Sequence, residues 1–325
     1  MKVLVTGANG FLGKYLLKAL LRENHEVVAL VRAAGAVTEL QALSCKVVRG
    51  DVTDKQSLRQ AFAGVEAVFH LASQVSVFSS DRAQLYKTNV EGTRNVLELC
   101  RENSVGRLVH VSSVVAVGAS SDAEGIMNEN SVNSTRAFQF PNCESKSVGE
   151  ELVLQACRRG EVDAVVVNPS MVFGAGDAVK PPRKGNILAA QGKLAWYTRG
   201  GLSAVGAEDV VAGMIAALKR GRKAERYILS GENLTMKQVL GLYAECAGAR
   251  PPRHEMPSWL LRMLGRIVDA LRLRIPLSWE GAVAATSFHW FDHSKAAKEL
   301  GFNPRPAREA IQGSVDWMRS QGYLG

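Results

Sequence analysis

Short apolar runs alternate with segments of helical periodicity through the first half of the chain. The runs are rich in valine and leucine and are apolar at successive positions, as expected of strands buried on both faces of a parallel sheet. The segments between them repeat apolar residues every three or four positions, as amphipathic helices do. The pattern predicts strands at residues 2–6, 26–31, 46–49, 67–70, 107–111 and 163–167, and helices at residues 11–23, 81–103 and 143–159.

Regular alternation of strands and helices predicts an α/β fold, a Rossmann-type doubly wound parallel sheet. We assign residues 1–170 to this Rossmann-type domain, with a strand and a helix from about 203–230 returning to it. Residues 171–325 are predicted to form a smaller, mostly helical substrate-binding lobe. Within it, residues 174–201 are rich in glycine, proline and basic residues and are predicted to be a long functional loop. Thr235 and Gln238 form a capping box that predicts a helix start.

Composition narrows the class of protein. A length of 325 residues suits two domains, and 46% hydrophobic with 22% charged residues excludes a disordered or fibrous chain. A net charge of +9 favours anionic partners, namely nucleotide phosphates, nucleic acid or an anionic membrane. We expect no nucleic-acid partner, because the sequence shows no recognition-helix or base-stacking pattern.

The cysteines and the N-terminus bear on the cellular compartment. Five cysteines, with no CxxC pair, argue against a disulfide framework and a cysteine zinc site and favour a reducing compartment. No apolar run suggests a signal peptide or a membrane-spanning helix. His289 and His293 lack a third ligand, so we predict no metal site. The cysteine content predicts a cytoplasmic location.

A glycine-rich turn joins the first predicted strand to the first predicted helix. Gly7 permits the tight turn, Gly10 lets a pyrophosphate approach the backbone, and Gly13 lets helix and strand pack closely. The helix N-terminus offers N–H groups and partial positive charge to phosphates. The turn therefore predicts a dinucleotide site with contacts at Gly7, Asn9, Gly10, Phe11, Leu12 and Gly13.

The end of the second strand bears on the choice of cofactor. A typical NAD site carries an acidic residue there, which binds the ribose hydroxyls. This chain has Arg32 instead, and a guanidinium can hold a 2′-phosphate with two parallel hydrogen bonds. NADP is favoured over NAD, although NAD stays open.

Together these features resemble the extended short-chain dehydrogenases/reductases, the NAD-dependent epimerase/dehydratase family, over nearly the whole chain. The matching segments are residues 50–52, 70–73, 89–93 and 169–174. The resemblance implies an adenine contact after the third strand, a cofactor-lining segment after the fourth, a helix asparagine that orders the active site, and a turn that holds the nicotinamide amide. The residues that it assigns to these roles are Asp51, Val52, Leu71, Ala72, Ser73, Asn89, Pro169, Ser170 and Val172.

Within this family, one subgroup is most similar. Residues 176–181, 225–229, 231–235 and 291–306 resemble hopanoid-associated sugar epimerases and dihydroflavonol-reductase-like proteins. The subgroup does not fix the substrate.

Family members work with a serine, a tyrosine and a lysine. The resemblance implies that the tyrosine exchanges a proton with the substrate, the lysine lowers the pKa of that phenol and binds the nicotinamide ribose, and the serine holds the substrate oxygen. Ser113 falls at the serine position, with Ser112 as the alternative, and Lys146 at the lysine position. Asn142 stands where the tyrosine is expected, and no tyrosine occurs between Tyr86 and Tyr197.

A carboxamide can polarise a carbonyl but has no proton to give near neutral pH. Three explanations therefore stay open: a substrate that needs no tyrosine, with its proton coming from water, another side chain or the substrate itself; an NADP-binding sensor or scaffold without turnover; or a tyrosine lost by mutation. The predicted function is NADP(H)-dependent hydride transfer to a carbonyl-type group of a small or hydrophobic metabolite, with a nucleotide-sugar epimerase or dehydratase as the alternative.

Residues 257–275 are predicted to form a basic amphipathic helix. Three interpretations stay open: packing over the substrate cleft, peripheral contact with a membrane surface, or an interface with a partner, for which a homodimer is one form. Its apolar positions are Leu260, Leu261, Leu264, Ile267, Val268 and Leu271, and its arginines are Arg262, Arg266, Arg272 and Arg274.

Overall fold

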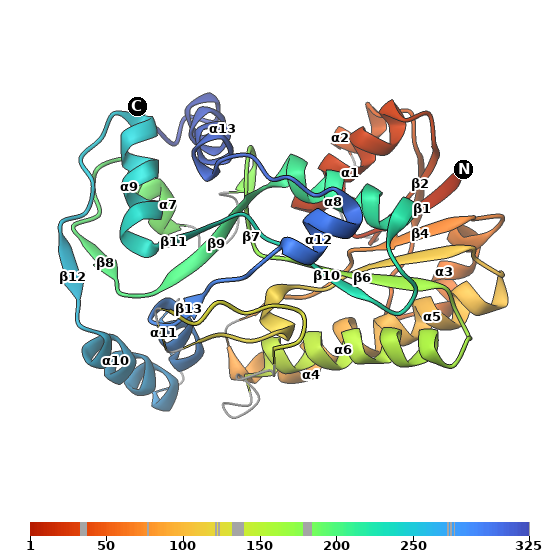
Figure 1. Ribbon diagram of the computed structural model, residues 1–325, viewed down its shortest axis with the longest axis horizontal. Coiled ribbons are helices and arrows are strands. Elements are labelled where there is room, and N and C mark those ends of the chain that lie inside the picture. Colours follow the sequence, from red (N-terminus) through yellow and green to blue (C-terminus); the bar gives the residue numbers. More distant parts are fainter. Residues whose placement is uncertain are drawn as a thin grey trace.

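A parallel seven-stranded sheet forms one half of the molecule, and a lobe built from the later part of the chain lies beside it (Figure 1). The computed structural model describes residues 1–32, 38–76, 78–120, 122, 124–131, 140–177, 184–271, 273, 275 and 277–324.

The sheet has the strand order β10-β6-β5-β4-β1-β2-β3, and all of its pairings are parallel. Because the order reverses between β1 and β4, the carboxyl ends of these two strands form the topological switch point, where doubly wound folds bind their ligands. The strands are β1 (Lys2–Thr6), β2 (Glu26–Val31), β3 (Lys46–Arg49), β4 (Ala67–His70), β5 (Arg107–Val111), β6 (Ala164–Pro169) and β10 (Arg226–Leu229).

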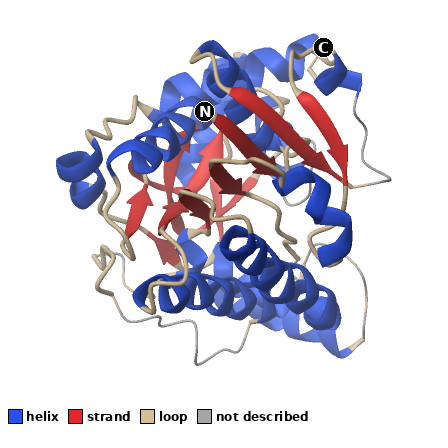
Figure 2. Ribbon diagram, turned by 90° about the vertical axis from the view of Figure 1, so that its right-hand side faces the viewer, coloured by secondary structure: helices blue, strands red, loops and turns tan. Residues whose placement is uncertain are grey.

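Helices cover both faces of this sheet (Figure 2). One face packs on α1 (Phe11–Arg22) and α8 (Ala207–Arg220) through leucine, valine and methionine side chains. The other packs on α3 (Lys55–Phe62), α5 (Gly92–Glu102) and α6 (Pro141–Arg158). The predicted doubly wound α/β fold is therefore confirmed. Short helices complete the domain at α2 (Thr38–Gln41), α4 (Arg82–Tyr86), Ser79–Asp81 and Val114–Ala116.

The helix predicted over residues 81–103 is not uniform. A π-helical segment, Lys87–Glu91, separates α4 from α5. Gly92 begins α5 beside Val52, and a β-carbon on Gly92 would lie 2.8 Å from a methyl carbon of that valine. The wider turn was not predictable from periodicity, because it shifts the register of the helix by a single residue.

The lobe holds strands as well as helices. Its four-stranded sheet pairs the central β9 (Gly201–Gly206) with β7 (Met171–Phe173), β11 (Glu232–Thr235) and β13 (Phe288–His289), and β8 (Trp196–Thr198) pairs with β12 (His254–Met256). The helices are α7 (Lys184–Ala190), α9 (Met236–Ala247), α10 (Ser258–Ala270), α11 (Trp279–Ala285), α12 (Ser294–Leu300) and α13 (Ala307–Ser320).

Two predictions for the lobe had different outcomes. The capping box of Thr235 and Gln238 at the start of α9 is confirmed. The prediction of a long loop over residues 174–201 was wrong, because this stretch contains α7 and β8. Ala189 and Ala190 of α7 are buried in an apolar cluster with Val239 and Tyr243 of α9, contacts that composition does not reveal. Residues 178–183 of the stretch lie outside the described part of the chain.

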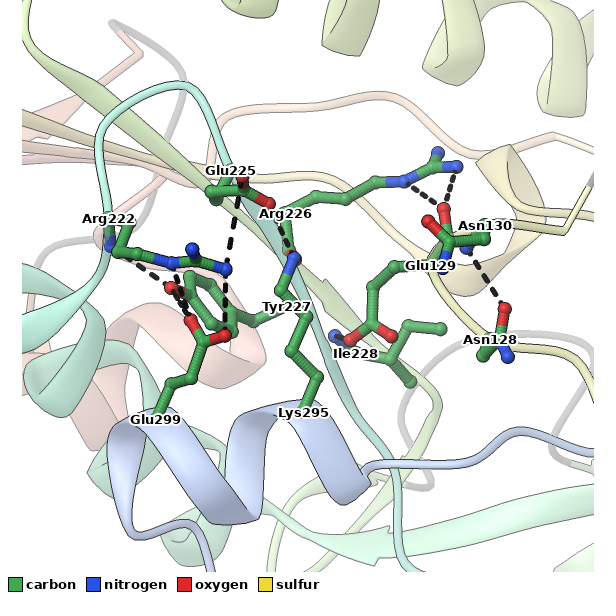
Figure 3. Close-up of polar contacts among 10 residues, drawn as sticks. All are labelled: Asn128, Glu129, Asn130, Arg222, Glu225, Arg226, Tyr227, Ile228, Lys295 and Glu299. Carbon is green, nitrogen blue, oxygen red and sulfur yellow. Dashed lines mark hydrogen bonds and ion pairs between the residues drawn. The ribbon is translucent and has the colours of Figure 1, made fainter.

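Strand β10 comes from the later part of the chain and forms an edge of the parallel sheet (Figure 3). The Glu129 carboxylate accepts a hydrogen bond of 2.9 Å from the Ile228 amide, which pairs a donor that an edge strand otherwise exposes. On its other side Tyr227 donates a 2.6 Å hydrogen bond to Glu299 of α12, and the Arg222 guanidinium lies 2.7 Å from the same carboxylate. These contacts attach β10 to segments distant in sequence.

Among the described residues, no helix is long and apolar enough to cross a lipid bilayer.

Candidate functional site

The glycine turn between β1 and α1 is closely packed. Gly7 has a φ of +69°, a left-handed conformation that favours glycine, and a β-carbon there would lie 2.8 Å from the Ala72 amide nitrogen. A β-carbon on Gly13 would lie 2.4 Å from the Gly7 carbonyl oxygen. Both glycines are therefore required by the close approach of α1 to the turn and of the turn to the segment after β4.

Gly10 is the N-cap residue of α1. No side chain caps the helix, its first turn holds no acidic residue, and a β-carbon on Gly10 would meet only the Gly7 oxygen within 4 Å. The first N–H groups of the helix are therefore accessible to an anion. This turn, which also contains Asn9, Phe11 and Leu12, fits a dinucleotide pyrophosphate.

Substituting Gly13 by alanine should destabilise the fold by about 2–3 kcal/mol, because the added methyl group has no room against the turn. The matched control is Gly241→Ala in the interior of α9, where a β-carbon meets nothing within 4 Å. That control should stabilise the protein by about 0.5–1 kcal/mol through helix propensity. Urea unfolding measures both, and a Gly13→Ala protein as stable as the wild type would contradict the packing.

Two arginines lie together where β2 and β3 end. Arg32 follows β2 directly and is exposed. Its carbonyl oxygen accepts a 2.9 Å hydrogen bond from the Arg49 guanidinium, and Arg49 pairs with Val31 in the sheet register. Sequence reasoning missed Arg49, although its position at the end of a strand that neighbours β2 was a usable signal.

Asp51 and Val52 follow β3. One Asp51 carboxylate oxygen accepts hydrogen bonds of 2.9 Å from both the amide and the hydroxyl of Thr53, which holds the turn in place. Val52 is buried against Gly92, and its carbonyl oxygen accepts a 2.8 Å hydrogen bond from the Asn95 side chain. The pair thus lies at the same edge of the sheet as Arg32.

The segment after β4 is tied to β1. The Thr6 hydroxyl accepts a 3.1 Å hydrogen bond from the Ala72 amide and lies 2.8 Å from Nδ1 of His70. The Leu71 amide donates to the Thr6 carbonyl oxygen at 3.3 Å. Leu71, Ala72 and Ser73 therefore run directly beside the glycine turn, as the family resemblance implies.

Asn89, in the π-helical segment, connects this strand end to α6. Its side-chain oxygen accepts a 2.8 Å hydrogen bond from the Gln74 amide. Its side-chain nitrogen donates to the Gln74 carbonyl oxygen at 2.9 Å and to the Ser145 hydroxyl at 3.0 Å. Asn89 therefore links the segment after β4 to α6.

Two serines follow β5. The Ser113 hydroxyl is half-buried and accepts a 3.4 Å hydrogen bond from the Val115 amide, where it caps a short helix. The Ser112 hydroxyl is buried and has no hydrogen-bond partner. Both serines lie at the carboxyl edge of the sheet, directly after β5.

Asn142 and Lys146 share one face of α6, because they are four residues apart on the same helix. The side-chain oxygen of Asn142 is buried and has no hydrogen-bond partner. Lys146 is only 7% exposed, and burial lowers the pKa of its ammonium group to about 8, although the Glu150 carboxylate opposes this shift. An ammonium group with this pKa can exchange a proton near neutral pH.

Tyr86 does not replace the expected tyrosine. It is the last residue of α4, with the Arg82 guanidinium 5.2 Å from the centre of its ring. Burial and a hydrogen bond with Glu144 raise the pKa of Tyr86 to about 12. Arg82 also forms a 2.8 Å ion pair with Glu144. The phenol is thus engaged in packing α4 on α6.

Two buried histidines lie beneath this face. The rings of His70 and His110 are 5.3 Å apart. Burial, with a smaller effect from the positive charge of Lys146, lowers the pKa of His70 to about 3, and burial also holds the pKa of His110 well below its usual value. Both imidazoles therefore stay neutral, so the group in this cluster that titrates near neutral pH is Lys146. Sequence reasoning missed His110.

The turn between β6 and β7 forms a further wall of the candidate site. The Ser170 amide donates a 3.1 Å hydrogen bond to the Leu229 carbonyl oxygen, while the Ser170 hydroxyl is buried without a partner. Pro169 ends β6, and Val172 is buried in β7. The Tyr15 hydroxyl of α1 donates a 3.0 Å hydrogen bond to the Ala175 carbonyl oxygen, which joins this turn to the glycine-turn helix.

Most of the predicted site residues thus lie along the carboxyl edge of the sheet or at the start of α1 and α6, while Asn89 lies in the π-helical segment and Val172 in β7. Buried polar atoms in folded proteins normally have partners. The unpaired oxygens of Asn142 and Ser170, together with the uncapped α1, fit a nicotinamide dinucleotide lying across the switch point. When bound, that cofactor would supply or accept a hydride.

A doubly wound sheet with this glycine turn defines a dinucleotide-binding protein. The chain belongs to the NAD dependent epimerase/dehydratase family, whose model matches residues 3–230.

Among similar curated proteins are a putative dihydroflavonol 4-reductase of Synechocystis sp., 32% identical over 98% of this chain and 95% of the relative, and sterol demethylase protein B of Methylococcus capsulatus, 32% identical over the full length of both. The crystal structure of gox2253 superposes with a TM-score of 0.87 at 31% identity and covers 99% of each chain. The family and these relatives place the chain among NAD(P)-dependent enzymes.

Proposed function

We propose that this protein is an NADP(H)-dependent reductase that transfers hydride to a carbonyl group of a hydrophobic metabolite, without a tyrosine acid. The observation that carries this proposal is the shared face of α6, where Asn142 lies one helical turn from a buried lysine whose pKa is about 8. The family and the reductase among the relatives support the reaction class.

Each residue of the site has a proposed role. The Ser113 hydroxyl holds the substrate oxygen, with Ser112 as the alternative. The Asn142 amide donates a hydrogen bond that polarises the carbonyl, as an oxyanion-hole group does. Lys146 holds the nicotinamide ribose and is also the source of the proton, because its pKa of about 8 lets it release one near neutral pH and the amide cannot.

The relatives support an apolar substrate. One is named for a dihydroflavonol and another for a sterol, both of which are polycyclic compounds. A bulky ring system favours a site whose specificity comes from apolar contacts, with few polar groups to orient the reacting carbonyl.

Turnover of NADPH tests the function. The purified protein should oxidise NADPH in the presence of one or more members of a panel of hydrophobic ketones and quinones. Tight NADPH binding without any turnover would instead favour a sensor or scaffold. Interconversion of a nucleotide sugar without net NADPH consumption would favour an epimerase.

The two arginines where β2 and β3 end support NADP over NAD. Replacing Arg32 by glutamate should weaken NADPH binding by about 10- to 100-fold, because it removes a charge-assisted contact with the 2′-phosphate, and should leave NADH binding nearly unchanged. Calorimetric titration with each cofactor measures the change. The control is Arg101→Glu, an exposed arginine in the last turn of α5. Equal losses for both cofactors would contradict the assignment.

We also propose a cytoplasmic location, which is supported by the absence of any disulfide among the five cysteines.

A further inference from the structure

Helix α10 is buried on one side only. It packs on α11, at one end of the molecule (Figure 1). Gly265 and Val268 are the buried residues of this contact, and a β-carbon on Gly265 would lie 2.9 Å from the Ser278 carbonyl oxygen. The opposite side faces outward and is apolar, with exposed fractions of 66% for Trp259, 44% for Met263, 46% for Ile267 and 63% for Leu271.

The prediction for this segment was partly wrong. The helix ends at Ala270, not at residue 275, and the predicted apolar positions do not share one face. Leu260, Leu261 and Leu264 are partly covered and Val268 is buried, whereas Ile267 and Leu271 are exposed. Arg272 and Arg274 lie outside the described residues.

The exposed apolar residues are concentrated in this segment. Of the thirteen large apolar side chains that are exposed in the described part of the chain, six lie between residues 259 and 275. Contiguous exposed apolar patches are uncommon on monomeric soluble proteins and mark interaction surfaces. We define this patch, the docking face, as Trp259, Met263, Ile267, Leu271, Leu273 and Ile275.

The segment that contains the docking face carries an excess of positive charge. Residues 250–275 contain six arginines but only two acidic residues, Glu255 and Asp269. An Asp269 oxygen accepts a 3.0 Å hydrogen bond from the Trp279 amide, which directs this carboxylate toward α11. The Arg266 side chain is exposed, and its guanidinium lies 4.3 Å from the centre of the Trp279 ring. An exposed apolar face within a segment that carries an excess of positive charge complements an anionic lipid surface.

We propose that α10 docks the protein on an anionic lipid bilayer, with the docking face in the boundary between headgroups and acyl chains and the exposed Arg266 near the headgroups. Charge distinguishes this occupant from a second copy of the chain. A two-fold pairing of docking faces would bring the arginines of both copies together, and like charges would oppose it.

This inference does not require the proposed redox function. If the substrate is apolar, docking also shortens its path from the membrane to the enzyme.

Sedimentation with lipid vesicles tests the proposal on the full-length protein. Binding to vesicles that contain about one third phosphatidylglycerol should exceed binding to pure phosphatidylcholine by at least about tenfold, and added salt should reduce it. The double variant Trp259→Ser/Ile267→Ser should lower the partition coefficient by at least about tenfold. The matched control, Ile126→Ser/Tyr323→Ser, removes two exposed apolar side chains elsewhere and should bind like the wild type.

Three outcomes would overturn the proposal: no binding to anionic vesicles, equal binding by the double variant, or a wild-type dimer in sedimentation velocity that the double variant converts to monomer. The last result would assign the face to self-association. NADPH binding, measured on the same preparations, should be equal in the wild type and both variants. Loss of vesicle binding with intact NADPH binding therefore reports on docking alone.

Discussion

Replacing Lys146 by methionine is expected to lower kcat/KM for NADPH-dependent carbonyl reduction by about a thousandfold, within the range that a positioned proton donor contributes. Lys146 lies one helical turn beyond Asn142, and it is the group in the buried cluster that titrates near neutral pH. Methionine has a similar length and lacks the charge, so the loss in kcat/KM would measure the contribution of the ammonium group to the reaction. Initial rates with a substrate from the carbonyl panel give the comparison.

The pH profile should identify the same group. Reduction requires the protonated lysine, so the wild-type rate should fall as the pH rises through about 8, the pKa to which burial lowers this ammonium group. The reverse oxidation should rise over the same interval. The Lys146→Met variant should lack both transitions, whereas Lys87→Met, which removes an exposed lysine from the nearby π-helical segment, should keep them. A wild-type profile without a transition near pH 8 would contradict the role.

The stability of the Lys146→Met variant shows whether its loss of activity comes from the missing ammonium group or from unfolding. Because burial lowers the pKa of Lys146 in the folded state, the buried charge opposes folding below pH 8, and the penalty declines as the pH rises above that value. The methionine variant should therefore unfold no more readily than the wild type at neutral pH. A large drop in its melting temperature would mean that lost activity reflects unfolding.

The second large effect is a gain in the rate of ketone reduction. Replacing Asn142 by tyrosine should raise the rate of ordinary ketone reduction by about 10- to 100-fold, because a phenol four residues before Lys146 would lie beside the ammonium group that lowers its pKa. Steady-state rates with NADPH and simple aryl ketones measure the gain.

A matched variant isolates the hydroxyl. Asn142→Phe adds the same ring without a proton to donate, so it should show no gain. Equal rates for the phenylalanine and tyrosine variants would mean that the position does not reach the reacting oxygen. A tyrosine variant that stays inactive while binding NADPH would favour the sensor or scaffold interpretation.

Local patterns predicted much of the fold because each depends on residues close together in the chain. The apolar runs placed β1 to β5 with their observed bounds, and the capping box placed the start of α9. The same reasoning failed for residues 174–201, where α7 is stabilised by packing on α9 about fifty residues later. The high glycine and proline content of this stretch gives no information about the packing of α7 on α9, because that contact involves residues distant in sequence.

By itself the sequence determined the doubly wound domain, the glycine turn at the start of α1, and the four-residue spacing of Asn142 and Lys146, whereas the structure extended the predicted helix back to Pro141 and so placed both residues on one face. Only the tertiary structure decided that Arg49 lies beside Arg32, that Asn89 joins Gln74 to Ser145, and which face of α10 is exposed. It also decided the pKa of Lys146, since burial beneath distant segments lowers it. The division has a physical cause: backbone conformation follows from neighbours along the chain, whereas burial and charge environment depend on which distant segments come together.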